Sequence, residues 1–430
     1  MSEEALSWGR YPRARQRVVP VYDRAAALPA TAELALPRGN GRSYGDTCLN
    51  PDGVLLATRA LDRFIAFDAE RGILRCESGV LLSQILALVV PHGWFLPVTP
   101  GTQQVSVGGA IANDVHGKNH HAQGSFGEHL RGFELLRSDG SRRWCSPSEH
   151  ADWFRASVGG LGLTGLITWA ELQLMRVAGP AMAGETLRFS SLREFFELSG
   201  ASDREHEYTV AWVDCLARGA ALGRGLFMRG GHGPGAIAEP AAQSLVRMPF
   251  TPPLPLVNGL SLRAFNTLYY AMPRRSPWCA HYRPFLYPLD SIRDWNRMYG
   301  PAGFLQYQCV VPPAVAQDAV RELLERIARS GQGSFLSVLK LFGDRAAPGL
   351  LSFARPGATL ALDFPNRGAA TFELLEQLDQ VVVRAGGAVY PAKDARMSGP
   401  SFRRYFPAWT EFQAYLDPRF SSGFWRRVME

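Results

Sequence analysis

A glycine-rich stretch from Thr99 to Leu130 constrains the fold of this chain more than any other part of its sequence. It reads TPGTQQVSVGGAIANDVHGKNHHAQGSFGEHL, with six glycines among amides, histidines and a lysine. Glycines this dense cost backbone entropy on folding, and a merely solvated loop has no use for them. A loop wrapped on a phosphate or a ring does, because successive bare N–H groups form an anion-binding nest. Since Val105, Val107 and Ile111 add apolar contacts, we predict a partly buried, ligand-binding loop.

Two further glycine-rich turns flank this loop in the sequence. Residues 34–46 (LALPRGNGRSYGD) lead from a short apolar strand into a turn, and residues 158–168 (VGGLGLTGLIT) are again flanked by strand-like sequence. The first turn has GxGxxxG spacing and is followed by another turn at 50–53, so we do not expect a Rossmann nicotinamide site. A plain connector is the alternative for each turn alone. Three such loops predict one extended ligand, such as a nucleotide with two phosphates and a large ring.

Composition excludes several classes of protein. The 430 residues suffice for two domains, and the net charge of +7 is spread without a basic run, so we do not expect nucleic-acid binding. The six cysteines form no CxxC pair, which is typical of a reducing compartment. We see no signal peptide and no apolar stretch of about twenty residues. We therefore expect a cytoplasmic protein, at most peripheral at the inner membrane.

Lysine is unusually rare. Only Lys118, Lys340 and Lys393 stand among the 46 basic residues, and the others are arginines. A lysine that persists against this bias indicates a place where a compact ammonium is needed and a planar guanidinium does not serve. Chance survival is the alternative.

The character of the chain changes after residue 178. Strand-like segments at 304–311 and 335–341 and helical patterns at 318–329 and 371–384 predict a second, sheet-based domain. We expect a first domain at 1–178, which carries the three glycine-rich loops, a substrate-binding domain at 179–387 and a returning segment at 388–430. Residues 245–275 alternate apolar residues with prolines, which favours neither strand nor helix. They suit a patch at the membrane interface. The alternative is that this segment packs into the protein core.

Eight short motifs follow one another along the chain: WGR (8–10), GRSYGD (41–46), GGAIANDVHGKNHH (108–121), GSFG (124–127), GPAGFLQYQ (300–308), FLSVLKLFG (335–343), LDFP (362–365) and AKDAR (392–396). In this order they resemble the decaprenylphosphoryl-β-D-ribose 2′-oxidase family, within the vanillyl-alcohol-oxidase class of FAD enzymes. The resemblance spans nearly the whole chain, HGKNHH with AKDAR is its specific part, and all three lysines lie inside it. It implies an α+β fold: a PCMH-type FAD-binding domain and a substrate domain built on an antiparallel sheet with flanking helices.

The resemblance also implies where ligands bind. FAD is expected on Gly39, Asn40, Gly41, Arg42, Ser43, Tyr44, Gly45, Pro100, Gly101, Thr102, Val107, Gly108, Gly109, Ala112, Asn113, His116, Gly117, Asn119, Gly162, Gly165, Ile167 and Lys393. The sugar is expected on Lys118, Gln306, Gln308, Lys340 and Tyr287, the two glutamines sharing one strand face by the two-residue period. Many relatives attach FAD through a histidine in a GHS motif, where this chain has Gly41-Arg42-Ser43. We therefore expect non-covalent FAD.

One position departs from the family. Mycobacterial members carry a cysteine immediately before the VDFP-like run, and this chain has Ala361 there. That cysteine is known as an inhibitor attachment point, so the change bears on inhibitor sensitivity more than on turnover.

The expected reaction is oxidation of a secondary alcohol, most simply C2 of a polyprenyl-phosphate-linked pentose, by hydride transfer to flavin N5. This is half of an epimerisation and implies a keto-reductase partner. Lys393, His116 and Tyr44 are the expected catalytic residues. Lys393 would stabilise the negative charge of reduced flavin or orient the hydroxyl, and an ion pair with Asp394 is the alternative. His116 would accept the hydroxyl proton, and a hydrogen-bonded loop residue is the alternative.

Other functions fit the sequence. A metal site at His116 and His120 is not expected, because Gly117 interrupts the helix that their spacing would need. The chain could oxidise a free sugar, alditol or aldonolactone, or serve as a flavin-bearing scaffold subunit. The electron acceptor is open among a quinone, oxygen and an artificial dye.

Overall fold

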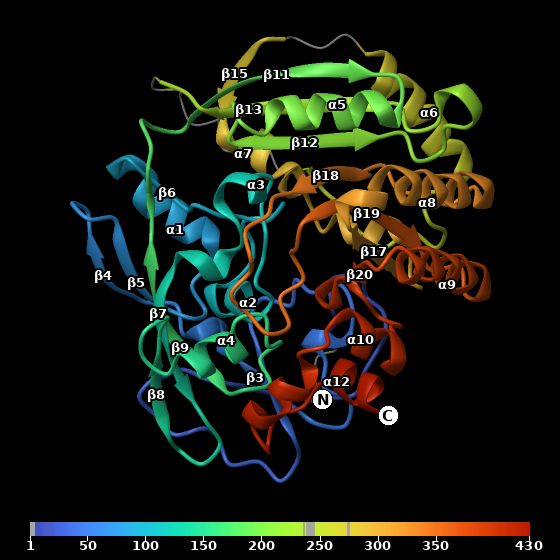
Figure 1. Ribbon diagram of the computed structural model, residues 1–430. Coiled ribbons are helices and arrows are strands. Elements are labelled where there is room, and N and C mark those ends of the chain that lie inside the picture. Colours follow the sequence, from blue (N-terminus) through green and yellow to red (C-terminus); the bar gives the residue numbers. More distant parts are fainter. Residues whose placement is uncertain (1–4, 235–236, 238–245, 273–275) are drawn as a thin grey trace.

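Two groups of strands divide the chain in the computed structural model, which describes residues 5–234, 237, 246–272 and 276–430 (Figure 1). The first group contains a small parallel sheet and an antiparallel sheet. The parallel sheet has the order β1 (Arg17–Pro20), β3 (Val54–Ala57), β2 (Ala35–Arg38). The antiparallel sheet has the order β4 (Phe64–Asp68), β5 (Ile73–Glu77), β9 (Leu166–Gln173), β7 (Leu130–Leu136), β8 (Arg142–Cys145).

Short helices and one further strand pair complete the first group. The pair joins β6 (Trp94–Phe95) to β10 (Met175–Arg176). The helices are α1 (Leu82–Val89), α2 (Val107–Ala112), α3 (His120–Gln123) and α4 (Ala151–Ser157). The predicted glycine-rich loop thus spans α2 and α3, and His116 lies between these helices and in neither of them.

The second group forms one antiparallel sheet. Its order is β15 (Trp278–His281), β11 (Ala181–Phe189), β13 (Gly225–His232), β12 (Tyr208–Val213), β18 (Val338–Phe342), β19 (Gly357–Pro365), β17 (Phe304–Val311), β20 (Ala388–Val389). Helices α5 (Leu192–Ser202), α8 (Ala316–Ser330) and α9 (Ala369–Arg384) pack on this sheet and on one another (Figure 1). The predicted α+β class with an antiparallel substrate sheet is confirmed.

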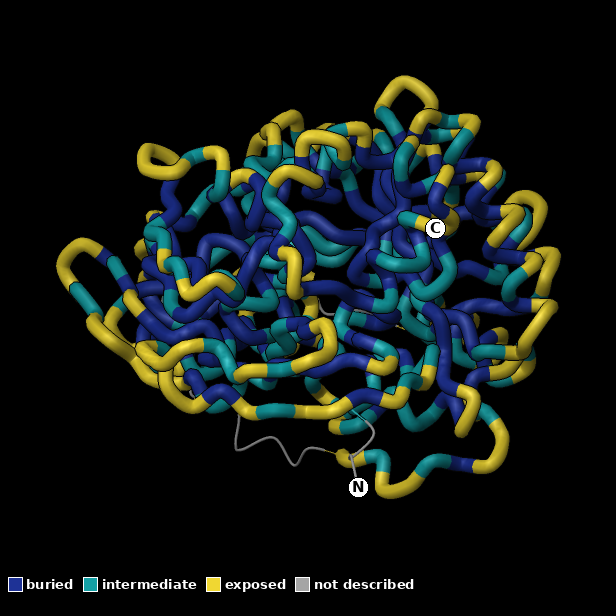
Figure 2. The backbone as a smooth tube through the Cα atoms, turned by 90° about the horizontal axis from the view of Figure 1, so that it is seen from below, coloured by how far each residue is buried: buried dark blue, intermediate teal, exposed yellow. Residues whose placement is uncertain are grey.

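Helix α8 illustrates why these segments fold as they do. Its buried residues Val320, Leu323, Leu324 and Ile327 follow the three- and four-residue spacing of one helix face. The helix ends at Gly331, whose φ of +69° is the left-handed conformation that a C-terminal cap needs. Strand β12, in contrast, is buried along its whole length. Figure 2 shows that buried segments run through the middle of the molecule, while exposed segments lie at its edge.

The C-terminal segment returns to the first group. Helices α10 (Gly399–Tyr405), α11 (Trp409–Phe412) and α12 (Gly423–Met429) lie beside the N-terminal part of the chain (Figure 1). Phe420 forms a bridge with Ala35 of β2. The chain passes from the first group of strands to the second between β10 and β11. Strand β20 lies after residue 387 but still pairs with β17 of the second group. The domain limits at 178 and 387 stay a prediction.

The expectation that residues 245–275 favour neither strand nor helix is wrong for the described part of this segment. Residues Gly259–Ala271 form helix α6, which contains no proline, and Asn258 caps it by accepting hydrogen bonds from the N–H groups of Leu260 and Ser261. The prolines between 249 and 255 precede the helix, so they do not break it. Arg274 and Arg275, which were expected to join the patch, lie outside the described residues. Across the described ranges, no helix combines the length and the apolarity needed to cross a membrane.

Three short elements lie near α6 in the sequence. Strands β14 (Val246–Arg247) and β16 (Ile292–Arg293) pair in parallel. Helix α7 (Tyr282–Leu286) continues into the 3-10 helix η6 (Pro288–Ser291). The α7–η6 segment packs on the glycine-rich loop and forms part of the site described next.

Candidate active site

A cavity of about 680 Å³ lies between the two groups of strands. The three glycine-rich loops line it from one side, and β12, β17 and β18 line it from the other. Its size is within the range of small-molecule and cofactor pockets. The loops predicted to touch one extended ligand therefore do face one shared space.

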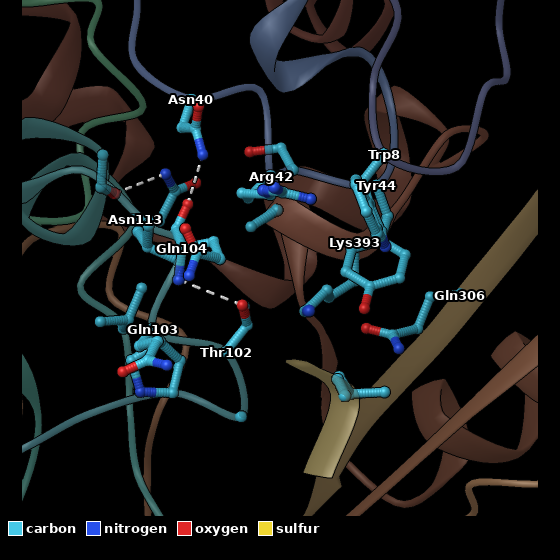
Figure 3. A pocket seen from close by; sticks show the side chains of 18 of the residues that line it. Trp8, Asn40, Arg42, Tyr44, Thr102, Gln103, Gln104, Asn113, Gln306 and Lys393 are labelled. Carbon is cyan, nitrogen blue, oxygen red and sulfur yellow. Dashed lines mark hydrogen bonds between the residues drawn. The ribbon is translucent and has the colours of Figure 1, made fainter. Parts of the chain in front are cut away.

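The first and central loops are joined directly. The side-chain amide of Asn40 donates to the carbonyl of Gln104 at 2.7 Å (Figure 3), and the next residue, Gly41, has a φ of +60°. Ser106 caps α2 by accepting from the N–H of Gly109. Glycine allows this left-handed turn without strain. Backbone groups of both loops lie at the cavity wall.

Buried polar atoms at the wall show what kind of ligand fits. In the described part of the chain, several side-chain atoms that line the cavity have no hydrogen-bond partner: Nε of Arg38, Nε of Arg42, Oγ1 of Thr47, Oγ of Ser78, Oε1 of Gln103 and Oδ1 of Asn113. Buried polar groups are nearly always paired in folded proteins. A long ligand with many donors and acceptors, such as a flavin dinucleotide, satisfies such a wall, so these residues fit FAD.

All three lysines of the chain line this cavity. Burial, helped by Lys118 and Lys393, lowers the pKa of Lys340 to about 7, and burial alone lowers the pKa of Lys118 to about 7. The ammonium of Lys118 donates to the carbonyls of Phe285 and Leu286 at the end of α7. It therefore holds the cavity wall, although the sequence predicted only a substrate contact for it.

The loop histidine is enclosed by strands of the second group. Nδ1 of His116 lies 3.1 Å from Nζ of Lys340, and its Nε2 lies 2.9 Å from the side-chain amide nitrogen of Gln308. Lys340 also donates to the carbonyl of Gly117. The ring of Phe342 packs edge-on against the imidazole at 4.8 Å. Burial, with the charge of Lys340, holds the pKa of His116 well below its usual value.

Lys393 faces Tyr44, and no ion pair with Asp394 forms. Its Nζ lies 3.8 Å from the centre of the Tyr44 ring. Gln306 donates to Asp363 at 2.7 Å, and the negative charge of Asp363 opposes the loss of the Lys393 proton. Burial nevertheless lowers the pKa of Lys393 and raises that of Asp363, because each charged form is desolvated.

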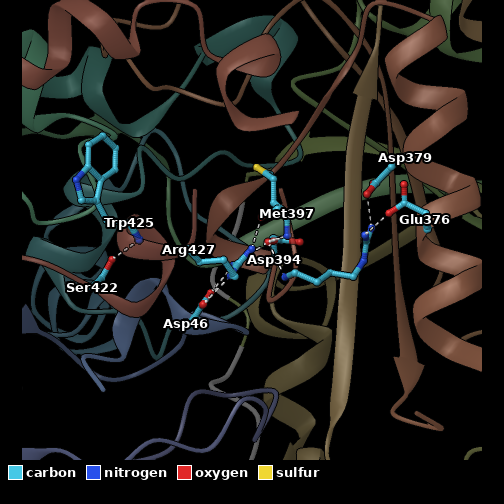
Figure 4. A network of polar contacts seen from close by, with 9 residues as sticks. Asp46, Glu376, Asp379, Asp394, Met397, Ser422, Trp425 and Arg427 are labelled. Atoms are coloured by element: carbon cyan, nitrogen blue, oxygen red, sulfur yellow. Dashed lines mark hydrogen bonds and ion pairs between the residues drawn. The ribbon is translucent and has the colours of Figure 1, made fainter. Parts of the chain in front are cut away.

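The residue after Lys393 anchors this lysine to the first domain. Asp394 pairs with Arg427 of α12 at 3.2 Å, and Arg427 also pairs with Asp46 at 2.7 Å (Figure 4). Arg396 pairs with Asp379 of α9 at 2.5 Å. These contacts fix the chain immediately after the short 3-10 helix η9 (Pro391–Lys393), which ends at the lysine.

Most residues expected at the site line the cavity. The cofactor-side residues that do so are Gly39, Asn40, Gly41, Arg42, Ser43, Tyr44, Pro100, Gly101, Thr102, Gly108, Gly109, Ala112, Asn113, His116, Gly117, Gly162, Gly165, Ile167 and Lys393. The substrate-side residues that do so are Lys118, Gln306, Gln308 and Lys340. This places them together, while their individual roles stay proposals.

Four expected residues do not line the cavity. The hydroxyl of Tyr287 bonds to Thr99 at 2.8 Å, and Asn119 donates to the carbonyl of Pro97, so both are used inside the fold. Val107 is buried in the core of the first domain. At Gly45, a Cβ would lie 1.7 Å from the backbone oxygen of Asp394, so close packing requires a glycine here.

Several lining residues were not predicted. Asp290 of η6 accepts hydrogen bonds from Oγ1 of Thr102 at 2.5 Å and from the N–H of Gln103 at 2.9 Å. Trp8 stacks on the guanidinium of Arg42 at 4.0 Å. The WGR motif marked Trp8, but nothing local marked Asp290, which lies 188 residues from its partner Thr102.

Comparisons with known proteins agree with this geometry. Residues 25–146 match the family described as FAD binding domain. The chain is 35% identical to the decaprenylphosphoryl-β-D-ribose oxidase of Mycolicibacterium smegmatis, over 99% of this chain and 97% of that protein. It is 34% identical to human Delta(24)-sterol reductase over 29% of this chain and 24% of the reductase. It is 30% identical to mouse L-gulonolactone oxidase over 31% of this chain and 30% of that enzyme. The cofactor is therefore FAD, and the chain is an FAD-dependent oxidoreductase.

Proposed function

Because the chain belongs to the family of decaprenylphosphoryl-β-D-ribose oxidases, we propose that it oxidises C2 of a polyprenyl-phosphate-linked pentose to a 2-keto sugar. The observation that carries this proposal is the cavity itself. Lysine, tyrosine and glutamine side chains of both domains meet there opposite the glycine-rich loops. Such a wall suits a polyhydroxylated, phosphorylated substrate held against a flavin.

Bound FAD supplies the hydride acceptor that no side chain can provide. Backbone N–H groups of the first and central loops hold its diphosphate, and no histidine stands at Gly41-Arg42-Ser43 to attach it, so it is bound non-covalently in this proposal. Lys393 places a positive charge beside Tyr44, where it stabilises negative charge or orients the substrate hydroxyl. Tyr44, Gln306 and Gln308 offer hydrogen bonds to the sugar.

The first experiment is an absorbance spectrum of the purified protein before and after acid precipitation. Yellow colour released to the supernatant supports non-covalent flavin, and colour kept in the pellet contradicts it. Anaerobic addition of polyprenyl-phospho-ribose should then bleach the flavin band. Bleaching by free ribose or gulonolactone instead would favour a free-sugar oxidase, and no bleaching by any of them would favour a scaffold subunit.

A lipid-linked substrate requires contact with a membrane, and one surface fits it. Leu254, Leu260 and Leu268 are 75%, 81% and 67% exposed in and before α6. Residues 240–289 contain no Asp or Glu, and they contain five arginines. Tyr269 of α6 and the neighbouring Arg247 line the cavity. We therefore place α6 at the surface of the inner membrane, with the protein bound peripherally beside its lipid-linked substrate.

Co-sedimentation with vesicles tests this surface. The double variant Leu260→Asp, Leu268→Asp should lose at least about tenfold in binding to phosphatidylglycerol vesicles, because burial of each leucine is worth about 1.5–3 kcal/mol. Tyr22→Asp is the matched control, since Tyr22 is an exposed apolar side chain in the first domain. Equal loss in the control, or no loss in the double variant, would contradict the placement.

The chemistry of the product also implies a partner. Epimerisation at C2 is complete only when the 2-keto sugar is reduced again, so a keto-reductase must consume it. We propose that this reductase acts on the lipid-linked product at the same membrane surface. A coupled assay with and without the reductase should show NAD(P)H consumption only after this chain has acted.

A further inference from the structure

The imidazole of His116 lies between the side-chain nitrogen atoms of Lys340 and Gln308. The number of hydrogens on these groups limits which hydrogen bonds the ring can form. Nδ1 faces Nζ of Lys340 at 3.1 Å, and Nε2 faces the side-chain amide of Gln308 at 2.9 Å. A neutral imidazole has one N–H and one lone pair, so it cannot accept hydrogen bonds at both nitrogens. When one ring nitrogen accepts, the other must donate.

Two arrangements satisfy this count. In the first, Lys340 is an ammonium that donates to Nδ1, and Nε2–H donates to the amide oxygen of Gln308. In the second, Lys340 is a free amine whose lone pair accepts from Nδ1–H, and the amide NH₂ of Gln308 donates to Nε2. A half-turn of the amide converts one into the other. Thr359, whose hydroxyl lies 3.2 Å from the amide, can donate or accept and so follows either arrangement.

The two arrangements differ by one proton, and that proton is on Lys340. Nζ of Lys340 also donates to the carbonyl of Gly117 and lies 5.1 Å from the centre of the Phe342 ring, and in the described residues none of its hydrogen bonds reaches a carboxylate. Burial and the neighbouring lysines bring the pKa of Lys340 to about 7, so both forms are populated near neutrality. Burial keeps the pKa of His116 far lower, so the ring stays neutral throughout.

Five charged or titratable groups surround the pair. They are Lys118 on the central loop, His120 on α3, Lys393 on η9, Tyr390 just before η9, whose ring centre lies 5.7 Å from that of His116, and, acting on Lys393, Asp363 on β19. The lysines and His120 disfavour a further positive charge. The surroundings therefore favour release of the Lys340 proton over formation of an imidazolium.

We propose that His116 relays a proton between the cavity and Lys340 by exchanging its tautomer. The proton enters at Nε2, which gains an N–H bond as the Gln308 amide turns. The Nδ1–H bond breaks, and a new N–H bond forms on the amine of Lys340. His116 is neutral before and after, and Lys340 stores the charge.

The relay deepens the proposed function, on which it rests for the origin of the proton. When the substrate hydroxyl is oxidised, its O–H bond breaks, the oxygen keeps the electron pair for the new C=O bond, and the proton passes to Nε2. The adjacent C–H bond also breaks, and its hydrogen leaves with both bonding electrons as a hydride, which the FAD of the proposed function would accept. The tautomer exchange itself needs no substrate, so it can be tested independently of the reaction.

Nitrogen NMR on the FAD-loaded protein tests the relay directly. With ring-¹⁵N histidine, long-range ¹H–¹⁵N spectra distinguish Nδ1–H, Nε2–H and imidazolium forms, and His116→Asn assigns the signal. Between pH 5.5 and 9 we expect His116 to stay neutral and to change from Nε2–H to Nδ1–H with a midpoint near 7. His129, whose Nε2 bonds to the carbonyl of Gln123 outside the cavity, is the internal reference.

Two variants of Lys340 separate the relay from a structural contact. Lys340→Arg retains a permanent positive charge and should lock the Nε2–H tautomer at every pH. Lys340→Met should abolish the pH-dependent exchange, and if that variant does not fold, the arginine variant makes the same test. A transition that persists in either variant, a tautomer that does not change in the unmodified protein, or an imidazolium signal between pH 6 and 8 would overturn the proposal.

The pH profile of turnover gives a second readout. The relay needs the free amine, so kcat/KM should fall by about tenfold per pH unit below pH 7 and level off above it. This dependence should vanish in Lys340→Arg. If the tautomer exchange is seen by NMR and no sugar is oxidised, the proposed function fails and the relay stands. A profile that is level between pH 5.5 and 7 would overturn the role of the relay in the reaction.

Discussion

Asp290 is one of the residues through which the α7–η6 segment holds the cofactor loop, and we predict that its loss weakens FAD binding. Asp290 accepts hydrogen bonds from Thr102 and from the N–H of Gln103. Thr102 lines the cavity, so the loop must keep this conformation to form the wall. In the Asp290→Ala variant both bonds are lost, and the loop is freer before FAD binds.

The size of the effect follows from these bonds. Hydrogen bonds to a charged group are worth about 1.5–3 kcal/mol. The loop stays attached through Tyr287 to Thr99 and through Lys118 to the end of α7, so it does not detach entirely. If FAD must restore the lost order, the dissociation constant rises by about tenfold to a hundredfold, since each 1.4 kcal/mol is about tenfold.

Quenching of FAD fluorescence on titration of the apoprotein measures this constant. Asp294→Ala is the matched control, because Asp294 lines the same cavity and pairs with the exposed Arg247 at 2.7 Å. Exposed ion pairs contribute about 1 kcal/mol or less, so the control should change the constant by less than about fivefold. A folded Asp290→Ala apoprotein that binds FAD within twofold of the unmodified chain would refute the reasoning.

Three further outcomes can be measured on single variants. Lys393→Met should lower anaerobic flavin reduction by substrate at least about a hundredfold while FAD stays bound, and unchanged reduction would show that its charge is dispensable. Gly45→Ala should destabilise the fold by about 3 kcal/mol in urea unfolding, because its Cβ would collide with the oxygen of Asp394, whereas Gly200→Ala, with open space around it, should not. Burial raises the pKa of Asp114 to about 6. The folded state therefore binds the Asp114 proton more tightly than the unfolded state does. The free energy of unfolding, relative to that of the Asp114→Asn variant, should fall by about 3 kcal/mol as pH rises from about 4 to above 6. A constant difference in unfolding free energy between the two proteins across that range would contradict this.

Features that depend on neighbouring residues were predictable from the sequence. Glycine density marked the loops that line the cavity, because backbone conformation is set locally. The two-residue period of a strand placed Gln306 and Gln308 on one face, and both line the cavity. The rarity of lysine singled out three positions that the fold brings to one cavity.

Other features could not be predicted because they depend on how the two domains pack. Tyr287 carries the right side chain for a sugar site, but its hydroxyl is used by Thr99. The proline-rich run before α6 hid a helix, since the helix begins only after the last of those prolines. Asp290 has no local signal at all, and its role exists only where η6 meets the glycine-rich loop.

The sequence by itself determined the glycine-rich loops and the lysines and amides available for chemistry. The tertiary structure decided which of these groups share protons and charge. Lys340 and His116 are 224 residues apart, and only the packing of β18 on the central loop brings their nitrogens within hydrogen-bonding distance. The physical reason is that backbone preferences act over a few residues, whereas desolvation and hydrogen bonding depend on what the fold places next to each group.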